Sequence, residues 1–222
     1  MKYLLSSYLR PKGKWSFISK LKENAKILDV GCGCACVIGV KSLLPNSTYF
    51  GIDIGDYGQN EYSKSLIDNY ILTSSKSFPQ KILNINEKFD AVISSHNLEH
   101  CDDREAVLNS MLKKVKKGGE IFISFPTEKS IYFPNRPALY YYSDKTHKYK
   151  PPKSSYIINE LLKNNFKITF YKKRYRPILF FILGILTEPF SALFKKVFIG
   201  TWELYGLETI IHAKKLNGKN LR

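Results

Sequence analysis

The chain has 222 residues, 44% of them hydrophobic and 24% charged, which argues against wholesale disorder. This length predicts a single globular domain over residues 1–222, with two small domains as the alternative. The formal net charge of +16 is uneven: residues 1–112 carry 13 Lys and Arg against 12 Asp and Glu, whereas residues 113–222 carry 22 against 7. The basic C-terminal half indicates an anionic partner, either nucleic acid, anionic lipid or a charged glycan.

The sequence predicts neither a signal peptide nor a membrane-spanning segment. Residues 1–15 lack the long apolar run and the small-residue cleavage site of a signal peptide. No uncharged apolar run reaches the roughly 18 residues that span a bilayer. We therefore expect a cytoplasmic protein.

Strands and helices alternate along the first part of the chain. Apolar runs predict buried strands at Ala25–Val30, Thr48–Asp53, Asn69–Thr73, Phe89–Ser95 and Glu120–Phe125. Helices are predicted over Cys36–Leu44 and Asp103–Val115, the second one closed by Lys116-Lys117-Gly118-Gly119. This alternation predicts a parallel sheet covered by helices on both faces.

The C-terminal part is less regular. Residues 127–152 are polar, aromatic and proline-containing, and a loop of this length predicts an active-site region. A helix is expected over Ser154–Asn165, strands over Phe166–Tyr171 and Leu207–Ala213, and a frayed tail over Lys214–Arg222. Between these two strands lies the apolar segment Pro177–Phe198, with basic residues on both sides.

The first strand leads into a glycine-containing turn, Asp29-Val30-Gly31-Cys32-Gly33, and the second strand ends at Asp53. Glycines let a backbone approach a ligand closely. An acidic residue at the end of the second strand is placed to accept hydrogen bonds from the ribose hydroxyls of a nucleoside. The third glycine of the dinucleotide pattern G-x-G-x-x-G is replaced by Cys36, so the spacing favours another adenosine-type cofactor.

The run Asp29-x-Gly31-x-Gly33 resembles the first motif of class I, Rossmann-like S-adenosylmethionine-dependent methyltransferases, although Ala35 replaces the third glycine that the family often has. Phe89–His100 resembles the fourth-strand motif of their small-molecule members. With the Gly118-Gly119 and Asp144-x-Thr-His147 elements, the resemblance extends from about Ala25 to Ala213. It implies an α/β fold with a seven-stranded, mostly parallel sheet. The minimal family pattern joins strands six and seven by a short hairpin, so the apolar and basic residues 172–206 are interpreted as an insertion within the domain.

The resemblance also implies S-adenosylmethionine as the cofactor and methyl transfer as the reaction. The cofactor-binding residues expected from these motifs are Asp29, Gly31, Cys32, Gly33, Asp53, Ile54, His96, Asn97 and Leu98. The acceptor is expected to be a small molecule or a lipid-linked glycan, methylated on a hydroxyl oxygen, with the isoprenoid-quinone pathway as a second source of acceptors.

A hydroxyl acceptor needs a base, and His is the usual base near neutral pH. His147 is the first candidate, because Asp144 could orient its ring, and His100 is the second. Each has a structural alternative: Asp144 could accept backbone hydrogen bonds in a turn, and His100 could make a contact at a helix start. The order His96-x-x-Glu99-His100 occurs in some zinc peptidases, but here it follows a strand, so no metal is expected.

The cysteines Cys32, Cys34 and Cys36 lack the second ligand pair of a structural zinc site, and we interpret them as small buried thiols in the turn. Two other functions remain open: a nicotinamide-dependent oxidoreductase, and a non-catalytic membrane- or nucleic-acid-binding module on the same fold. The residues Ser95–Leu98 lack the Pro-Pro motif of nucleic-acid methyltransferases, so no nucleic acid is expected.

The apolar and basic residues 172–200 have three alternative roles: a lid over the acceptor, a dimer contact or an in-plane membrane anchor. Flanking Lys and Arg side chains favour the anchor, because each contributes about 1 kcal/mol near an anionic leaflet. We expect peripheral association with the inner face of the membrane. The sequence leaves the oligomeric state open.

Overall fold

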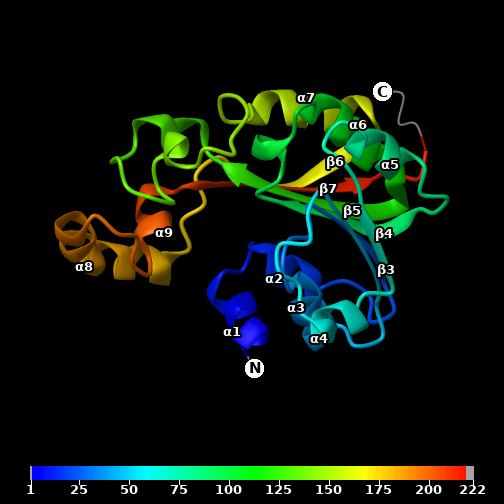
Figure 1. Cartoon of the computed structure of the whole chain (residues 1–222), viewed down its shortest axis with the longest axis horizontal. Helices are drawn as coiled ribbons and strands as arrows, with labels where there is room; N and C mark the ends of the chain where they lie inside the picture. Colours follow the sequence, from blue (N-terminus) through cyan, green and yellow to red (C-terminus); the bar gives the residue numbers. More distant parts are fainter. Residues whose placement is uncertain (1, 219–222) are drawn as a thin grey trace.

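The structure of the chain is a computed structural model that describes residues 2–218 (Figure 1). Seven strands form one sheet in the order β3-β2-β1-β4-β5-β7-β6. Their bounds are β1 (Lys26–Val30), β2 (Thr48–Asp53), β3 (Asn69–Leu72), β4 (Phe89–Ser95), β5 (Val115–Pro126), β6 (Phe166–Lys172) and β7 (Glu208–Lys215). The first five strands are parallel, and β7 runs antiparallel between β5 and β6. The predicted seven-stranded, mostly parallel sheet is confirmed.

Helices cover both faces of the sheet (Figure 1). One face carries α5 (Phe78–Leu83), α6 (Arg104–Lys114) and α7 (Ser154–Lys163), whose apolar side chains form one core with the strands. The other face carries α2 (Lys14–Ile18) and α3 (Cys36–Leu43), which build a second core. Figure 1 also places α1 (Lys2–Leu9) and α4 (Glu61–Ser65) on this second side.

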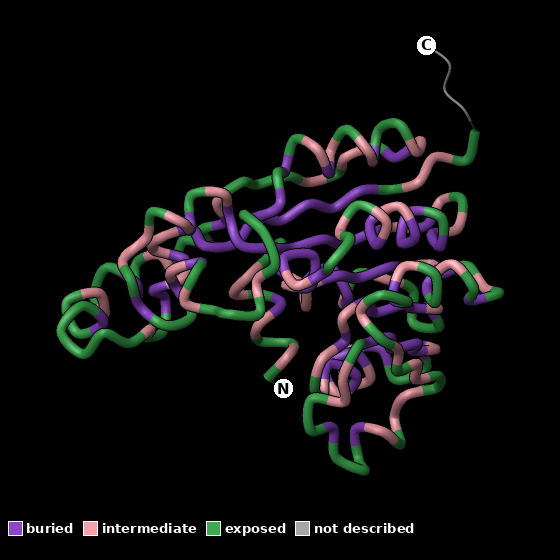
Figure 2. The backbone as a smooth tube through the Cα atoms, turned by 45° about the horizontal axis from the view of Figure 1, so that its top comes forward, coloured by how far each residue is buried: buried purple, intermediate pink, exposed green. Residues whose placement is uncertain are grey.

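The central strands are apolar along their whole length because both of their faces are covered. In Figure 2 they form the largest buried part of the backbone. Ile27, Val30, Val92 and Ile93, for example, are fully buried in β1 and β4. The edge strand β6 instead alternates in burial along its first residues. This arrangement holds the carboxyl ends of β1, β2 and β4 rigidly beside one another.

The glycine pair Gly118-Gly119 lies inside β5 instead of separating a helix from a strand. The helix ends at Lys114, and β5 begins at Val115, five residues before the predicted strand. The β4–β5 register shifts there, from Phe89 opposite Val115 to Ala91 opposite Glu120. An added Cβ at Gly119 would lie 2.9 Å from the Asp90 carbonyl oxygen, so this irregular pairing requires glycine.

The predicted frayed tail is wrong for its first two residues. Lys214 and Lys215 belong to β7, where Lys214 pairs with Glu120 and Lys215 with Phe166. The last four residues of that tail, 219–222, lie outside the described residues.

Two helices connect β6 to β7 and extend away from the sheet, at the left of Figure 1: α8 (Ile178–Phe194) and α9 (Thr201–Tyr205). They pack closely, because a Cβ added at Gly184 of α8 would lie 2.3 Å from the Gly200 carbonyl oxygen. The rest of α8 is largely exposed (Figure 2). Within residues 2–218, no helix combines the length and apolar character needed to cross a bilayer.

Candidate active site

A cavity of about 710 Å³ opens at the carboxyl ends of β1, β2 and β4. Such a volume is typical of a small-molecule site, and this edge of an open α/β sheet is where ligands bind. Six of the residues expected at a cofactor site line it: Gly31, Gly33, Asp53, Ile54, His96 and Asn97.

The two glycines of the first turn have different roles. Gly31 has a φ of +74°, and an added Cβ there would lie 2.4 Å from Cγ of Asn97, so the turn packs directly against the loop after β4. Gly33 has a φ of +55°, and an added Cβ there would meet no atom within 4 Å. Gly33 therefore leaves open space at the wall of the cavity. The neighbouring Cys34 is exposed, contrary to the prediction of three buried thiols, while Cys32 and Cys36 are buried.

Asp53 is held in one orientation at the end of β2. Its carboxylate accepts hydrogen bonds from the backbone N–H groups of Gly33 and Ile54, both at 2.7 Å. The side chain is buried, and this burial raises the pKa of Asp53 even though both hydrogen bonds favour the carboxylate form. The end of β2 thus presents the fixed carboxylate of Asp53 to the cavity, beside the open space at Gly33.

Three other expected cofactor residues do not line this cavity. Asp29 is buried and accepts a hydrogen bond from the Tyr49 hydroxyl at 2.8 Å. Cys32 is buried beneath the turn, within the second core, and Leu98 packs in the first core. These side chains support the turn and the loop from behind.

A second cavity of about 270 Å³ adjoins the first, and His96 and His100 line both. The other polar and aromatic residues that line it include Glu99, Tyr141, Asp144, His147 and Trp202. Residues of the loop 127–152 therefore lie on both cavities, since Lys145, Thr146 and Lys148 line the first.

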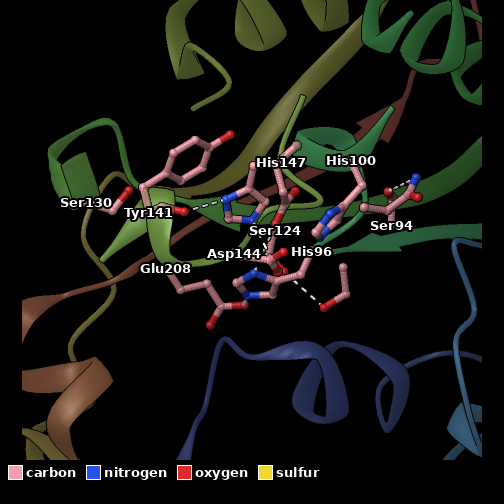
Figure 3. A network of polar contacts seen from close by, with 12 residues as sticks. Ser94, His96, His100, Ser124, Ser130, Tyr141, Asp144, His147 and Glu208 are labelled. Atoms are coloured by element: carbon pink, nitrogen blue, oxygen red, sulfur yellow. Dashed lines mark hydrogen bonds and ion pairs between the residues drawn. The ribbon is translucent and has the colours of Figure 1, made fainter. Parts of the chain in front are cut away.

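His96 bridges two carboxylates at the junction of the cavities. Its Nδ1 lies 3.3 Å from Oε1 of Glu99. Its Nε2 lies 3.4 Å from Oε1 of Glu208, whose side chain lies beside the ring in Figure 3. Burial opposes a charge on this ring, but the two carboxylates outweigh it and raise the pKa of His96 to about 10. His96 is therefore a protonated imidazolium near neutral pH and cannot accept a proton.

His147 is fixed by Tyr141 rather than by Asp144. Its Nδ1–H donates a hydrogen bond to the Tyr141 carbonyl oxygen at 2.7 Å, whereas its Nε2 lies 3.8 Å from Oδ2 of Asp144, beyond hydrogen-bonding distance (Figure 3). Burial lowers the pKa of His147, so this ring is neutral at pH 7. The Asp144 carboxylate instead accepts hydrogen bonds from the backbone N–H and the hydroxyl of Thr146.

His100 lies at the end of the short 3₁₀ helix η1 (Leu98–His100) and faces the loop. Its Nδ1 is 2.8 Å from Oγ1 of Thr146, and its ring centroid is 4.8 Å from that of His147. The structure thus brings together all three residues that the sequence offered for acid–base chemistry. Their contacts run through Thr146, which the sequence did not single out.

Some residues of the site carry no local signal in the sequence. Glu208 at the start of β7 contacts His96 and also accepts a hydrogen bond from Arg10 at 2.7 Å. Contacts with His96 and Arg10 outweigh burial and lower the pKa of Glu208 to about 2. Arg10 and Glu208 are 198 positions apart, and no local pattern signals such a pair.

Comparison with known proteins gives a consistent result. Residues 6–169 match a protein family described as "Methyltransferase domain". A protein named "Ubiquinone biosynthesis O-methyltransferase, mitochondrial" from Dictyostelium discoideum is 30% identical over 115 residues, which are 46% of this chain and 35% of that protein. A "Ubiquinone biosynthesis O-methyltransferase" from Pseudomonas putida is 29% identical over 101 residues, 45% of this chain and 43% of that protein. The chain thus matches less than half the length of these curated relatives.

Solved structures show the same fold. A SAM-dependent methyltransferase from Archaeoglobus fulgidus superposes with a TM-score of 0.57 at 21% identity, covering 97% of this chain and 95% of that one. An S-adenosylmethionine-dependent methyltransferase from Mesorhizobium loti gives a TM-score of 0.57 at 16% identity, covering 91% and 97%. At these sequence identities, the structural similarity shows a shared fold and nothing more.

Proposed function

Because this chain belongs to the family of class I S-adenosylmethionine-dependent methyltransferase domains, we propose that it methylates a hydroxyl oxygen of a small-molecule or lipid-linked glycan acceptor. One observation carries the proposal: the cofactor-side cavity and a smaller cavity rich in histidine and aromatic side chains meet at His96 and His100. A methyl donor in the first cavity and an acceptor in the second would face each other at this junction.

The residues at the first cavity fit S-adenosylmethionine, which supplies an electrophilic methyl group on a positively charged sulfonium. Asp53 would accept hydrogen bonds from the ribose hydroxyls, and the open space beside Gly33 would admit the cofactor close to the backbone. Ile54 would pack against the adenosine. His96 and Asn97, at the other end of the cavity, would lie nearer the methionyl part.

The acceptor side supplies two imidazole rings. His147 has a lowered pKa and a fixed ring, and His100 lies next to it. Either Nε2 could take the proton of an acceptor hydroxyl, with His147 as the first choice. Asp144 would act indirectly, because it orients Thr146, which in turn orients His100. His96 would contribute a fixed positive charge rather than a base.

A lipid-borne acceptor is favoured by the exposed apolar face of α8. Its exposed large apolar side chains recur every three or four residues, and three of the steps are single residues: Ile178, Leu179, Ile182, Ile185, Leu186, Phe190, Leu193 and Phe194. Exposed basic residues lie on both sides of the helix, among them Lys172, Arg176, Lys195 and Lys196. This combination fits the interface of an anionic membrane. We therefore propose peripheral membrane association through residues 172–200.

A partly buried ion pair links α8 to the loop 127–152. Arg136 of the loop donates two hydrogen bonds to the Glu188 carboxylate of α8 and a third to Ser191. Tyr205 of α9 donates to the same carboxylate at 2.6 Å. Contact of α8 with a membrane would thus bring the loop 127–152, which lines the acceptor cavity, close to lipid-borne molecules.

Two acceptor classes follow from this placement: a lipid-linked glycan, and an isoprenoid quinone-type molecule, which the names of the D. discoideum and P. putida proteins favour. The test is to incubate the protein with methyl-labelled S-adenosylmethionine and members of both classes, and to identify the methylated product. An O-methylated product supports the proposal. Binding of NADH without binding of S-adenosylhomocysteine would overturn it in favour of an oxidoreductase.

A further inference from the structure

We propose that Glu99, His100 and His147 form a binding site for one divalent transition-metal ion, with zinc as the expected metal, at the wall of the acceptor cavity. One donor atom from each residue lies within 4.8 Å of the other two. Three donors that share one tetrahedral metal ion at about 2.0–2.2 Å lie roughly 3.3–3.6 Å apart. Side-chain shifts of up to about 1 Å toward a common centre would therefore complete the site.

Glu99 is the buried member of the group. Its side chain is fully buried, and neither carboxylate oxygen has a hydrogen-bond partner among residues 2–218. The imidazolium of His96 approaches Oε1 as an ion pair at 3.3 Å, which leaves Oε2 without a contact of this kind. A buried carboxylate oxygen without a donor is costly, and a cation would satisfy it.

His147 has the arrangement of a metal ligand. Its Nδ1–H donates to a backbone carbonyl oxygen, that of Tyr141, and this fixes the ring in the tautomer whose Nε2 carries a lone pair. Metal-binding histidines nearly always donate their other ring N–H to a carbonyl or carboxylate in this way. The stacked Tyr141 ring also holds the plane of the imidazole.

His100 has the same arrangement through a longer chain of hydrogen bonds. The Thr146 hydroxyl donates to Oδ1 of Asp144 at 2.6 Å, so Oγ1 is left to accept a hydrogen bond from Nδ1–H of His100. The hydrogen-bond network therefore assigns the proton of His100 to Nδ1 and a lone pair to Nε2. In both rings the lone pair that a metal ion could use is therefore on Nε2.

The loop that carries His147 is fastened to the segment that carries Glu99 and His100. The backbone N–H of Lys148 donates to the Glu99 carbonyl oxygen at 3.0 Å. Arg104, at the start of α6, donates to the Lys150 carbonyl oxygen, and the Tyr149 hydroxyl donates to that of Asp102. These contacts fix the three donor groups relative to one another before any ligand binds, which favours metal binding.

Two neutral imidazoles and one carboxylate are the donor set of catalytic zinc sites, which keep further positions open for a substrate. All three residues line the acceptor cavity, so an open position would face the acceptor. This catalytic part of the inference rests on the proposed function. With the metal bound, Nε2 of His100 and of His147 would be ligands, and neither could act as the base. The cation would instead bind the acceptor hydroxyl oxygen and lower its pKa, so that the O–H proton passes to water and the electron pair stays on oxygen.

The test uses the full-length chain, freed of metal by a chelator and titrated calorimetrically with Zn²⁺; Co²⁺ serves as a spectroscopic probe. We expect one equivalent of Zn²⁺ to bind. His100→Ala, His147→Ala and Glu99→Gln should each weaken binding by more than about 100-fold, and Thr146→Val, which removes only an orienting contact, by about 10-fold. Binding of S-adenosylhomocysteine should persist in every variant, which shows that the fold and the cofactor site are intact.

Three control variants separate this site from adventitious binding. Cys34→Ser removes the exposed thiol, His212→Gln removes a histidine elsewhere in the fold, and Glu105→Gln removes an exposed carboxylate; none should change Zn²⁺ affinity. The inference is overturned if the parent binds no Zn²⁺, or if the three ligand variants bind it as tightly as the parent. Site-dependent binding without any methylated product would support the metal site and count against the proposed function alone.

Discussion

The imidazole of His147 is stacked on the ring of Tyr141, with centroids 4.1 Å apart and planes 22° from parallel, and it also hydrogen-bonds to the carbonyl oxygen of the same residue. Tyr141 is itself buried, and its hydroxyl donates to the Tyr149 carbonyl oxygen at 2.8 Å. One residue therefore fixes the position, the plane and the tautomer of the histidine that faces the acceptor cavity.

Replacing Tyr141 tests this positioning role. Tyr141→Ala removes the stacked ring but not the backbone carbonyl, so the imidazole should lose its orientation, and kcat should fall by about 10- to 100-fold, because misplaced catalytic groups are costly. Tyr141→Phe keeps the ring and should retain most of the activity. Turnover is measured with the acceptor found in the screen, and S-adenosylhomocysteine affinity is measured by calorimetry. A fall in cofactor affinity equal to the fall in turnover would indicate general unfolding instead.

Asp53 provides the test of the cofactor site. Hydrogen bonds to a charged group contribute about 1.5–3 kcal/mol each, so Asp53→Ala should weaken S-adenosylmethionine binding by roughly 10- to 100-fold. Asp53→Asn can still accept hydrogen bonds but has lost the charge, so its affinity for S-adenosylmethionine should lie between those of Asp53→Ala and the parent. Calorimetric titration gives all three affinities. Equal affinities in the parent and in Asp53→Ala would remove this residue from the cofactor site.

The sheet was predictable because its signals are local. A strand that is covered on both faces reads as a short apolar run, and the glycines and Asp53 follow such runs directly. The irregular start of β5 was not predictable in this way. Val115 continues the apolar period of the preceding helix, and only the pairing with Phe89 shows that it has entered the sheet.

The residues of the candidate site could be predicted more readily than the contacts between them. The sequence placed Asp144 beside His147 and left open whether it orients the ring or closes a turn. The structure shows the turn, with Asp144 accepting hydrogen bonds from Thr146. The protonated state of His96 depends on Glu208, more than a hundred positions away, and the apolar residues 178–194 gave no indication of which side chains would be exposed.

The exposed face of α8 predicts binding to anionic vesicles. Full burial of a leucine side chain contributes roughly 1.5–3 kcal/mol, so a Leu186→Glu, Leu193→Glu double variant should lower the vesicle-bound fraction at least about tenfold. Leu162→Glu, at a comparably exposed leucine of α7, is the matched control and should bind as the parent does. Cosedimentation with anionic and neutral vesicles measures the effect. A parent protein that stays in the supernatant with anionic vesicles at low salt would direct attention to a dimer interface instead.

His212 predicts how stability depends on pH. Its ring is buried among Phe17, Phe122 and Phe170, with Lys12 and Lys20 as the charged groups that act on it. Burial lowers its pKa from 6.5 to about 4, although the contact between Nε2 and the Lys12 carbonyl oxygen at 3.0 Å opposes the shift. The folded state therefore binds this proton only at a much lower pH than the unfolded state does.

The sign of the effect follows from that difference. Above pH 6.5 the ring is neutral in both states, and its ionisation does not affect stability. Between pH 6.5 and 4 the unfolded chain takes up a proton that the folded chain excludes, so the unfolding free energy should fall by up to about 1.4 kcal/mol per pH unit, or about 3 kcal/mol in total. His212→Gln, whose amide can still donate to the Lys12 carbonyl, should lose this contribution while the carboxylates titrate as in the parent. Urea unfolding of both proteins from pH 7 to pH 4 measures the difference, and parallel curves would show that His212 titrates alike in both states.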